Sequence, residues 1–531
     1  MFNSDSRMIY SQKFISGFAL IRYVKALIFL CCPIFLFCLQ SNAAIKLPAL
    51  FADHMVLQQN SKVPIWGWAS PGENISVEAS WQKNKVHTKA DASGNWKLEL
   101  KTPKAGGPYV IYVSGENSIQ LHDILIGEVW LCSGQSNMTF PLKYSDSSKQ
   151  EIAKADYPSI RYFDVKHQYG KEPFNNCKGA WQITSPQTSA SFSAVAYYFA
   201  KKIQKQLNVP IGIVCSAWGG TPAEAWTPKE VLQKDDSLQF FLQRWKEIPK
   251  KVGADSIRYN LRLQQWEEEK KSGNDTPKPD KPRDFYYYSQ PWCEPAALFN
   301  GMIHPLIPFC FKGILWYQGE SNVSESNLYQ NLFTWLIKSW RKLWRDEGNQ
   351  KQLPFYFVQI APFGYGNLEA AAELREAQYN VMKTVDNTGM AVTIDLGDMN
   401  NIHFTHKKEV GERLAFIALA KSYAYKNVIY KGPVCNKISK VNNKLELRFD
   451  QKLFTIDEEK PQGFEIGYKD PSSDSMRFVK AQSIVKHNEV EVWNDTVKVP
   501  LVVRYAWLDA GEANLINESK LPAYPFAKRV N

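Results

Sequence analysis

The sequence predicts an α/β protein in which a parallel β-sheet is preceded and followed along the chain by a small all-β unit. Three observations support this fold class: short alternating apolar runs come first, fully apolar runs separated by helical stretches follow, and alternation returns towards the C-terminus. Alternation is typical of strands with one solvated face, whereas continuous apolar runs between helices are typical of parallel strands covered on both faces. With 531 residues, of which 44% are hydrophobic, the chain is long enough to form several cores.

Residues 1–43 are predicted to be a signal peptide. Basic residues precede an apolar run over 26–38, and the small residues Ala43 and Ala44 suit cleavage. The apolar run is short for a bilayer and is interrupted by Pro33, so no stable membrane span is expected. We therefore expect the mature protein to be exported to the periplasm or the extracellular space.

The net charge and the cysteines argue against two kinds of partner. The formal charge of +11 falls to +8 without the first 43 residues, and so small a balance over so long a chain predicts no nucleic-acid partner. The six cysteines after residue 43 contain no C-x-x-C pair, so no metal site is expected. The disulfide pairing and the oligomeric state are left open.

Two β domains are predicted at the ends of the mature chain, an N-terminal one over 44–122 and a C-terminal one over 426–531. Short alternating runs separated by turn residues are typical of small sandwiches and barrels. These runs cover 63–68, 75–79, 96–100, 444–449 and 489–493.

Residues 123–425 are predicted to form the central α/β domain. A charged, helix-favouring stretch over 229–285 interrupts it, which we interpret as a solvated surface insertion such as a helical hairpin. The apolar strand-like runs of the domain cover 124–131, 211–215, 313–317, 355–360 and 390–394.

Ser136 is the first candidate catalytic residue. It follows the buried run over 124–131 through the small and polar segment 132–135, which permits a tight turn. A hydroxyl at the carboxyl end of a sheet strand, with backbone N–H groups beside it, suits nucleophilic attack on an ester. Helix N-capping is the alternative role for a serine in this position. Met138 stands where a G-x-S-x-G elbow would have its second glycine, so that motif is absent.

Three further polar segments follow buried runs. Gly219 and Gly220 come after the run over 211–215, where a glycine N–H could serve as an oxyanion donor or simply form part of a turn. Hydrogen-bonding side chains crowd the segment 316–322 at the end of the next run. His403 precedes a helix-like stretch and has carboxylates upstream, as a general base and its orienting acid require. These loops are expected to converge on one edge of the sheet.

Several segments, spread over nearly the whole mature chain, resemble those of the sialate O-acetylesterases, a family of the SGNH hydrolase superfamily. Besides the motifs around Ser136 and His403, the segments that carry the resemblance cover 47–58, 299–303, 374–378 and 503–507. The resemblance implies an SGNH-like three-layer α/β/α sandwich with Ser136 as nucleophile and His403 as general base. It also implies an oxyanion hole formed by the amides of Ser136 and Gly220 and the side chain of Asn322.

The orienting acid departs from the pattern of the family. Many bacterial members carry an Asp two positions before the histidine and a Pro after it, where this chain has Asn401 and Phe404. Members of the wider superfamily carry the acid three positions before, where this chain has Asn400. The carboxylates considered for this role are, in order of preference, Asp398, Asp395 and Glu320. A Ser–His dyad assisted by a backbone carbonyl is the remaining alternative.

The resemblance implies that the protein removes acetyl groups from an O-acetylated sugar or glycan, with 9-O-acetyl sialic acid as the leading substrate. It implies no metal and no organic cofactor. An acetylated polysaccharide such as xylan is the alternative substrate, and a non-catalytic carbohydrate-binding protein is the alternative of a different class. Trp218, Trp226 and Trp316 are candidate contacts for a sugar ring, with core packing as the alternative for at least two of them.

Overall fold

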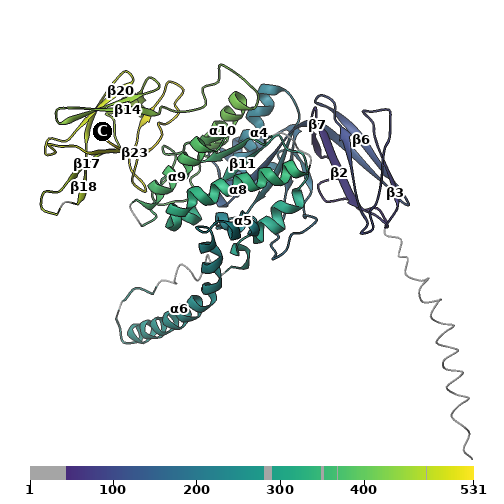
Figure 1. The fold of residues 1–531 in the computed structure, drawn as a ribbon, viewed down its shortest axis with the longest axis horizontal. Helices are drawn as coiled ribbons and strands as arrows, with labels where there is room; N and C mark the ends of the chain where they lie inside the picture. The colour runs from purple at the N-terminus through teal and green to yellow at the C-terminus, as the bar shows by residue number, and fades with distance from the viewer. Residues whose placement is uncertain are drawn as a thin grey trace, which may run out of the picture.

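The computed structural model describes residues 44–274, 276–279, 290–347, 352–366, 369–473 and 475–530. A parallel sheet covered by helices on both faces lies at the centre of the molecule, and smaller β-sheets lie at either end (Figure 1). This arrangement confirms the predicted fold class. The expected signal peptide lies outside the described residues. Within the described part of the chain, no helix combines the length and the apolar character needed to cross a bilayer.

The central sheet has the strand order β13-β12-β11-β7-β10-β8-β9, and all its strands are parallel except β9, which is antiparallel at one edge. Each apolar run that the sequence shows in this domain falls in, or overlaps, one of the parallel strands. The strands are β7 (Ser118–Gly134), β8 (Tyr157–Asp164), β9 (Trp181–Thr184), β10 (Ile211–Ala217), β11 (Gly313–Tyr317), β12 (Phe355–Val358) and β13 (Thr388–Ala391).

Two pairs of helices cover the sheet and complete three layers (Figure 1). Helices α4 (Ala194–Leu207) and α10 (Lys407–Lys421) pack on one face, and α8 (Ser326–Asp346) and α9 (Ala370–Thr384) pack on the other. Successive residues of a strand enter opposite cores, so Trp130 packs in the α4–α10 layer and Leu131 in the α8–α9 layer. The shorter helices at the ends of strands are α2 (Ser136–Thr139) and α3 (Ser148–Ala153).

Strand β7 belongs to both the N-terminal unit and the central sheet. Up to Ile126 it pairs with β6 in antiparallel fashion, and from Glu128 to Gly134 it pairs with β10 and then also with β11. The domain boundary expected between residues 122 and 123 therefore falls within one continuous strand. The other strands of the N-terminal unit are β1 (Val56–Gln58), β2 (Lys62–Trp68), β3 (Asn74–Ala79), β4 (Val86–Lys89), β5 (Asn95–Lys101) and β6 (Gly106–Ser114).

The C-terminal unit contains two four-stranded antiparallel sheets, in the orders β14-β15-β20-β19 and β18-β17-β21-β23, and the small pair β16-β22. Phe449 and Phe526, from different sheets, have ring centroids 6.2 Å apart. The buried Arg375 of α9 donates hydrogen bonds to backbone carbonyls of residues 506–509, which docks the unit on the central domain. The strands are β14 (Cys435–Val441), β15 (Lys444–Phe449), β16 (Phe454–Thr455), β17 (Phe464–Lys469), β18 (Met476–Lys480), β19 (Gln482–Lys486), β20 (Glu489–Trp493), β21 (Val502–Tyr505), β22 (Leu515–Ile516) and β23 (Phe526–Arg529).

The charged insertion forms a short helix, α5 (Lys229–Lys234), and a helix of 33 residues, α6 (Gln239–Lys271), which extends away from the body of the molecule (Figure 1). Phe241 and Ile248 are the buried residues of α6. Within its described residues, the insertion is therefore a solvated surface segment built around one long helix. Arg244 ties the first turns of α6 to the domain through ion pairs with Glu224 and Glu325.

Gly134 at the end of β7 should tolerate no side chain. Its φ is +135°, and a Cβ atom there would lie 2.1 Å from the carbonyl oxygen of Tyr317. We expect Gly134→Ala to lower the free energy of unfolding by at least about 2 kcal/mol, because backbone strain and atomic overlap act together. Gly253→Ala in α6 is the matched control, since a Cβ there meets nothing within 4 Å and alanine favours a helix. Urea unfolding measures both variants, and equal stability of the two would contradict this prediction.

Candidate active site

The carboxyl ends of three central strands lie level with one another. Gly134, the last residue of β7, is paired with Ala217 of β10 on one side and with Tyr317 of β11 on the other. The loops that follow these strands therefore begin side by side at one edge of the sheet. Open α/β sheets present their ligand sites at this edge.

A cavity of about 520 Å³ opens where these loops meet. The loops after β7, β10, β11, β12 and β13 all contribute to its wall, so the structure brings Ser136, Gly220, Glu320 and His403 together. The loop after β12 is a contributor that the sequence did not reveal. The lining residues are Gln135, Ser136, Gly219, Gly220, Pro222, Glu320, Ser321, Phe363, Gly364, Tyr365, Ile402 and His403.

Ser136 is the first residue of α2 and directly follows the extended residue Gln135. Within the described residues, the backbone N–H groups of Ser136, Gly219 and Gly220 have no hydrogen-bond acceptor. Gly219 lies against the serine, because a Cβ atom on this glycine would be 3.2 Å from the Ser136 Cβ. Unpaired amides beside a half-buried hydroxyl are the arrangement that stabilises an oxyanion during attack on an ester.

His403 lies on the loop between β13 and α10, and its side chain is half-buried. The Asn401 side chain accepts a hydrogen bond from the backbone N–H of His403 at 2.9 Å, which shapes the loop. Burial lowers the pKa of His403, and the positive charge of Lys407 lowers it further. The imidazole is therefore neutral at pH 7 and able to accept a proton. Of the residues that the structure describes, none forms a hydrogen bond with the ring.

The three candidate acids lie in different surroundings. Asp398 is exposed, accepts a backbone N–H of its own turn at 2.9 Å, and does not line the cavity. Asp395 is held by Arg413, whose guanidinium nitrogens lie 2.7 and 2.5 Å from its two oxygens. Glu320 is the one of the three that lines the cavity with His403. Among the described residues Asp398 makes no hydrogen bond to the His403 ring, and its role as the orienting acid stays a prediction.

The Glu320 carboxyl is buried in the cavity wall. Its Oε1 accepts a hydrogen bond from Asn137 at 2.5 Å, whereas Oε2 has no partner in the described part of the chain. Burial raises the pKa of Glu320, and the Asn137 hydrogen bond and the positive charge of Lys407 oppose that rise. A buried oxygen without a partner is costly, which makes Glu320 a functional candidate in its own right.

Asn322, which was expected in the oxyanion hole, lies away from the cavity. Its side chain is fully buried, accepts the Ala223 backbone N–H at 2.8 Å and donates to Glu224 at 2.9 Å. Gln318 also donates to its oxygen, at 2.7 Å. The Asn322 side chain thus joins the loop after β11 to the turn over 223–226, and its role in the oxyanion hole stays a prediction.

The residues on either side of Ser136 hold the neighbouring loops. Gln135 Oε1 accepts two backbone N–H groups of the loop after β11, each at 3.3 Å. Asn137 donates to Glu320 and to the carbonyl oxygen of Ile402, at 2.5 and 3.1 Å. Sequence reasoning assigned neither residue a role. Their position beside the candidate nucleophile was the available signal.

The candidate tryptophans all pack against other aromatic rings. Trp226 and Trp316 are fully buried, with ring centroids 6.1 Å apart. Trp218 is stacked against His167 and against Trp292, at centroid separations of 3.9 and 5.1 Å. Trp218 therefore packs against two neighbouring rings. Among the residues that line the cavity, Phe363 and Tyr365 are the aromatic ones.

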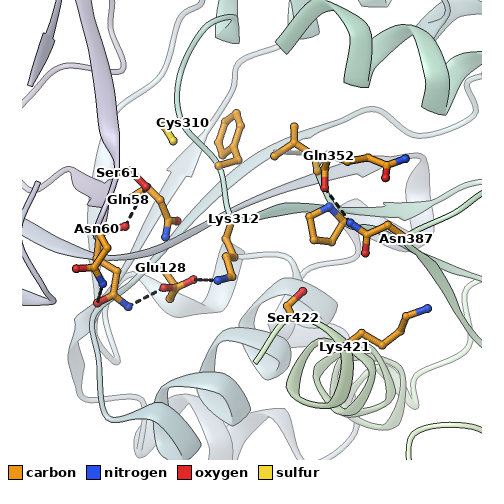
Figure 2. A pocket seen from close by; sticks show the side chains of 14 residues that line it. Gln58, Asn60, Ser61, Glu128, Cys310, Lys312, Gln352, Asn387, Lys421 and Ser422 are labelled. Carbon is orange, nitrogen blue, oxygen red and sulfur yellow. Dashed lines mark hydrogen bonds and ion pairs between the residues drawn. The ribbon is translucent and has the colours of Figure 1, made fainter. Parts of the chain in front are cut away.

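A second cavity, of about 480 Å³, lies at the amino ends of the central strands and contains none of the candidate residues (Figure 2). Its buried carboxylate, Glu128, accepts hydrogen bonds from Gln59 at 2.6 Å and from Tyr423 at 2.9 Å, and Lys312 lies 3.6 Å away. Both oxygens of Glu128 are thus satisfied. In the described part of the chain, no three His, Cys, Asp or Glu side chains are grouped as metal ligands would be, and none of the cysteines forms a disulfide.

Comparison with known proteins decides the family. The family model described as "Carbohydrate esterase, sialic acid-specific acetylesterase" matches residues 126–264 and 289–420. The chain belongs to this carbohydrate esterase family. The matched ranges include every residue that lines the cavity of about 520 Å³. This carbohydrate esterase is a carboxylic ester hydrolase, with an O-acetylated carbohydrate as the class of its substrate.

Curated relatives and a solved structure resemble this esterase over most of its length. Sialate O-acetylesterase of Rattus norvegicus is 30% identical over 445 residues, which are 76% of this chain and 78% of the relative. Sialate O-acetylesterase of Homo sapiens is 28% identical over 530 residues, 89% of this chain and 90% of the relative. The crystal structure of a carbohydrate acetylesterase from Xanthomonas citri has a TM-score of 0.76 and 34% identity, and the match covers 91% of this chain and 99% of that chain.

Asn322→Ala should lower the stability of the esterase more than its catalytic rate. We expect the free energy of unfolding to fall by about 1–3 kcal/mol, because buried Glu224 loses a hydrogen-bond donor. Loss of an oxyanion donor lowers kcat by about 10²–10³, whereas for Asn322→Ala we expect a fall of less than about tenfold. Urea unfolding and hydrolysis of 4-nitrophenyl acetate measure the two effects. A hundredfold lower kcat at unchanged stability would return Asn322 to the oxyanion hole.

Proposed function

We propose that this esterase is a serine hydrolase of O-acetylated sugars whose natural substrate is 9-O-acetyl sialic acid, which it converts to sialic acid and acetate. The observation that carries the proposal is the single cavity lined by Ser136, Gly219, Gly220 and His403. The sialate O-acetylesterases that match most of the chain support sialic acid as the sugar. We further propose that residues 1–43 act as a signal peptide and that the enzyme is exported.

An acetylated polysaccharide such as xylan is the second candidate substrate. The Xanthomonas citri relative, which is 34% identical, is described as a carbohydrate acetylesterase without mention of sialic acid. Both substrates present an acetyl ester on a sugar hydroxyl. The same nucleophile, base and oxyanion donors serve either one, so the difference lies in the sugar contacts around the cavity.

The first half of the reaction transfers the acetyl group to the enzyme. His403 accepts the proton of the Ser136 hydroxyl while Oγ bonds to the acetyl carbonyl carbon. The carbonyl oxygen becomes an oxyanion and is held by the N–H groups of Ser136 and of Gly219 or Gly220, which have no other acceptor in the described residues. The bond to the sugar oxygen then breaks, His403 gives that oxygen its proton, and an acetyl-serine is left.

The second half releases acetate. Water attacks the acetyl-serine carbonyl while His403 accepts one of its protons, and the same amides hold the second oxyanion. The bond to Ser136 Oγ breaks, and the imidazole returns the proton to the serine. His403 is positively charged in both steps before it gives up the proton. Glu320 is the candidate carboxylate that shares the cavity with this imidazolium, and its negative form stabilises it.

Acetate release from an O-acetylated sialoglycoprotein should exceed release from acetylated xylan at equal ester concentration. Ser136→Ala is the control, and its rate should be lower by about 10⁴ or more because the nucleophile is missing. Measurement of free acetate compares the substrates directly. Activity on xylan without activity on the sialoglycoprotein would favour the second candidate. An unchanged rate for Ser136→Ala would exclude the serine mechanism altogether.

Glu320→Gln should reduce turnover, and Asp398→Asn is its matched control. We expect kcat to fall about 10- to 100-fold for Glu320→Gln, because removal of a supporting group commonly costs this much. Asp398 is exposed and does not line the cavity, so kcat for Asp398→Asn should stay within about twofold of the wild type. Initial rates of 4-nitrophenyl acetate hydrolysis by the two variants decide between Glu320 and Asp398 as the acid. The reverse order of effects would reinstate Asp398 as the acid.

A further inference from the structure

Lys407 is a buried amine beside residues that line the cavity. It is the first residue of α10, four positions after His403, and its side chain is fully buried. Its Nζ lies 3.5 Å from the ring centroid of Phe404 and 4.8 Å from that of Phe140. An amine enclosed in this way is costly unless a partner compensates for the lost water.

One hydrogen bond leads from Lys407 into the catalytic loops. Nζ donates to Oδ1 of Asn137 at 2.7 Å. The amide nitrogen of Asn137 donates in turn to Glu320 Oε1 at 2.5 Å and to the carbonyl oxygen of Ile402 at 3.1 Å. Ile402 precedes His403, and both line the cavity. The hydrogen bonds therefore connect Lys407 to a cavity carboxyl and to the loop of the general base.

We propose that Lys407 is a positioning residue for ester hydrolysis: through Asn137 it holds Glu320 and the His403 loop in place, and its positive charge keeps the imidazole unprotonated. The proposal rests on the proposed function, because that function makes His403 the general base. The Lys407 ammonium can only donate hydrogen bonds, so the amide oxygen of Asn137 must face it. The amide nitrogen then has to point at Glu320 and Ile402, as it does.

The charges around Nζ support this role. The titratable groups that face it from the surrounding elements are Glu320, Asp146 with its partner His406, Tyr317 and His403. Burial lowers the pKa of Lys407 to about 7, and the negative charges of Glu320 and Asp146 oppose that change. Burial and the positive charge of Lys407 both lower the pKa of His403 from its ordinary value. Once Lys407 is protonated, its charge opposes protonation of the His403 imidazole.

Lys407→Met removes the charge and the donor, and Lys408→Met removes an exposed charge one position further along as the matched control. For Lys407→Met we expect kcat with 4-nitrophenyl acetate to fall about 10- to 100-fold, with KM within about twofold. The acid limb of the kcat/KM profile should move up by about one pH unit, because loss of a positive neighbour raises the pKa of His403. The wild type and Lys408→Met should share the same acid limb, at lower pH than that of Lys407→Met.

Lys407→Gln provides a second variant that keeps a donor but lacks the charge. We expect it to recover part of kcat while its acid limb stays shifted, which separates the hydrogen bond from the charge. NMR titration of the histidine rings, with His403→Gln to assign the signal, gives the pKa of His403 without any substrate. An unchanged His403 titration in either folded Lys407 variant overturns the proposal. Absence of ester hydrolysis by the wild type would instead overturn the proposed function.

Discussion

The backbone pairing at the carboxyl end of β7 determines where the groups of the cavity lie. Gly134 is paired with both Ala217 and Tyr317, so loops that are far apart in the sequence begin side by side at one edge of the sheet. The next residues then connect those loops through side chains: Gln135 holds the loop after β11, and Asn137 holds that loop and the one before α10. Neutral amides suit this task, because each offers donors and an acceptor at a lower cost of burial than a charge.

The arrangement of the central domain follows largely from local sequence patterns. A run such as 313–317 is apolar throughout because both faces of β11 are covered, and its limits agree with those of the strand. Strand β8 was not predicted, since it contains Arg161, which is buried only because its guanidinium pairs with Asp123 at 2.6 Å. Because Asp123 is distant from Arg161 in the sequence, the local pattern around Arg161 does not predict its burial. The start of β7 was also missed, because its first residues alternate like the N-terminal strands with which they pair.

The sequence predicted those site residues whose positions follow from the ends of the strands. Ser136 and Gly220 lie within three residues of strand ends and line the cavity, and His403 was identified by its chemistry. The side chains of Asn322 and Asp398 take directions that depend on loop geometry, which residue types do not reveal. The burial of Lys407 was equally hidden, because a lysine at the start of a helix is ordinarily exposed.

Strand β7 belongs to both the N-terminal unit and the central sheet, and this affects the order in which the strand leading to Ser136 acquires its partners during folding. Strands β6 and β7 are joined by a tight turn over 115–117, so their pairing closes a short loop at little cost in chain entropy. The pairing of β7 with β11 requires the closure of a very long loop, which makes it intrinsically slow. We therefore expect the β6–β7 hairpin to form early, so that the strand leading to Ser136 is anchored at one end before β11 pairs with it.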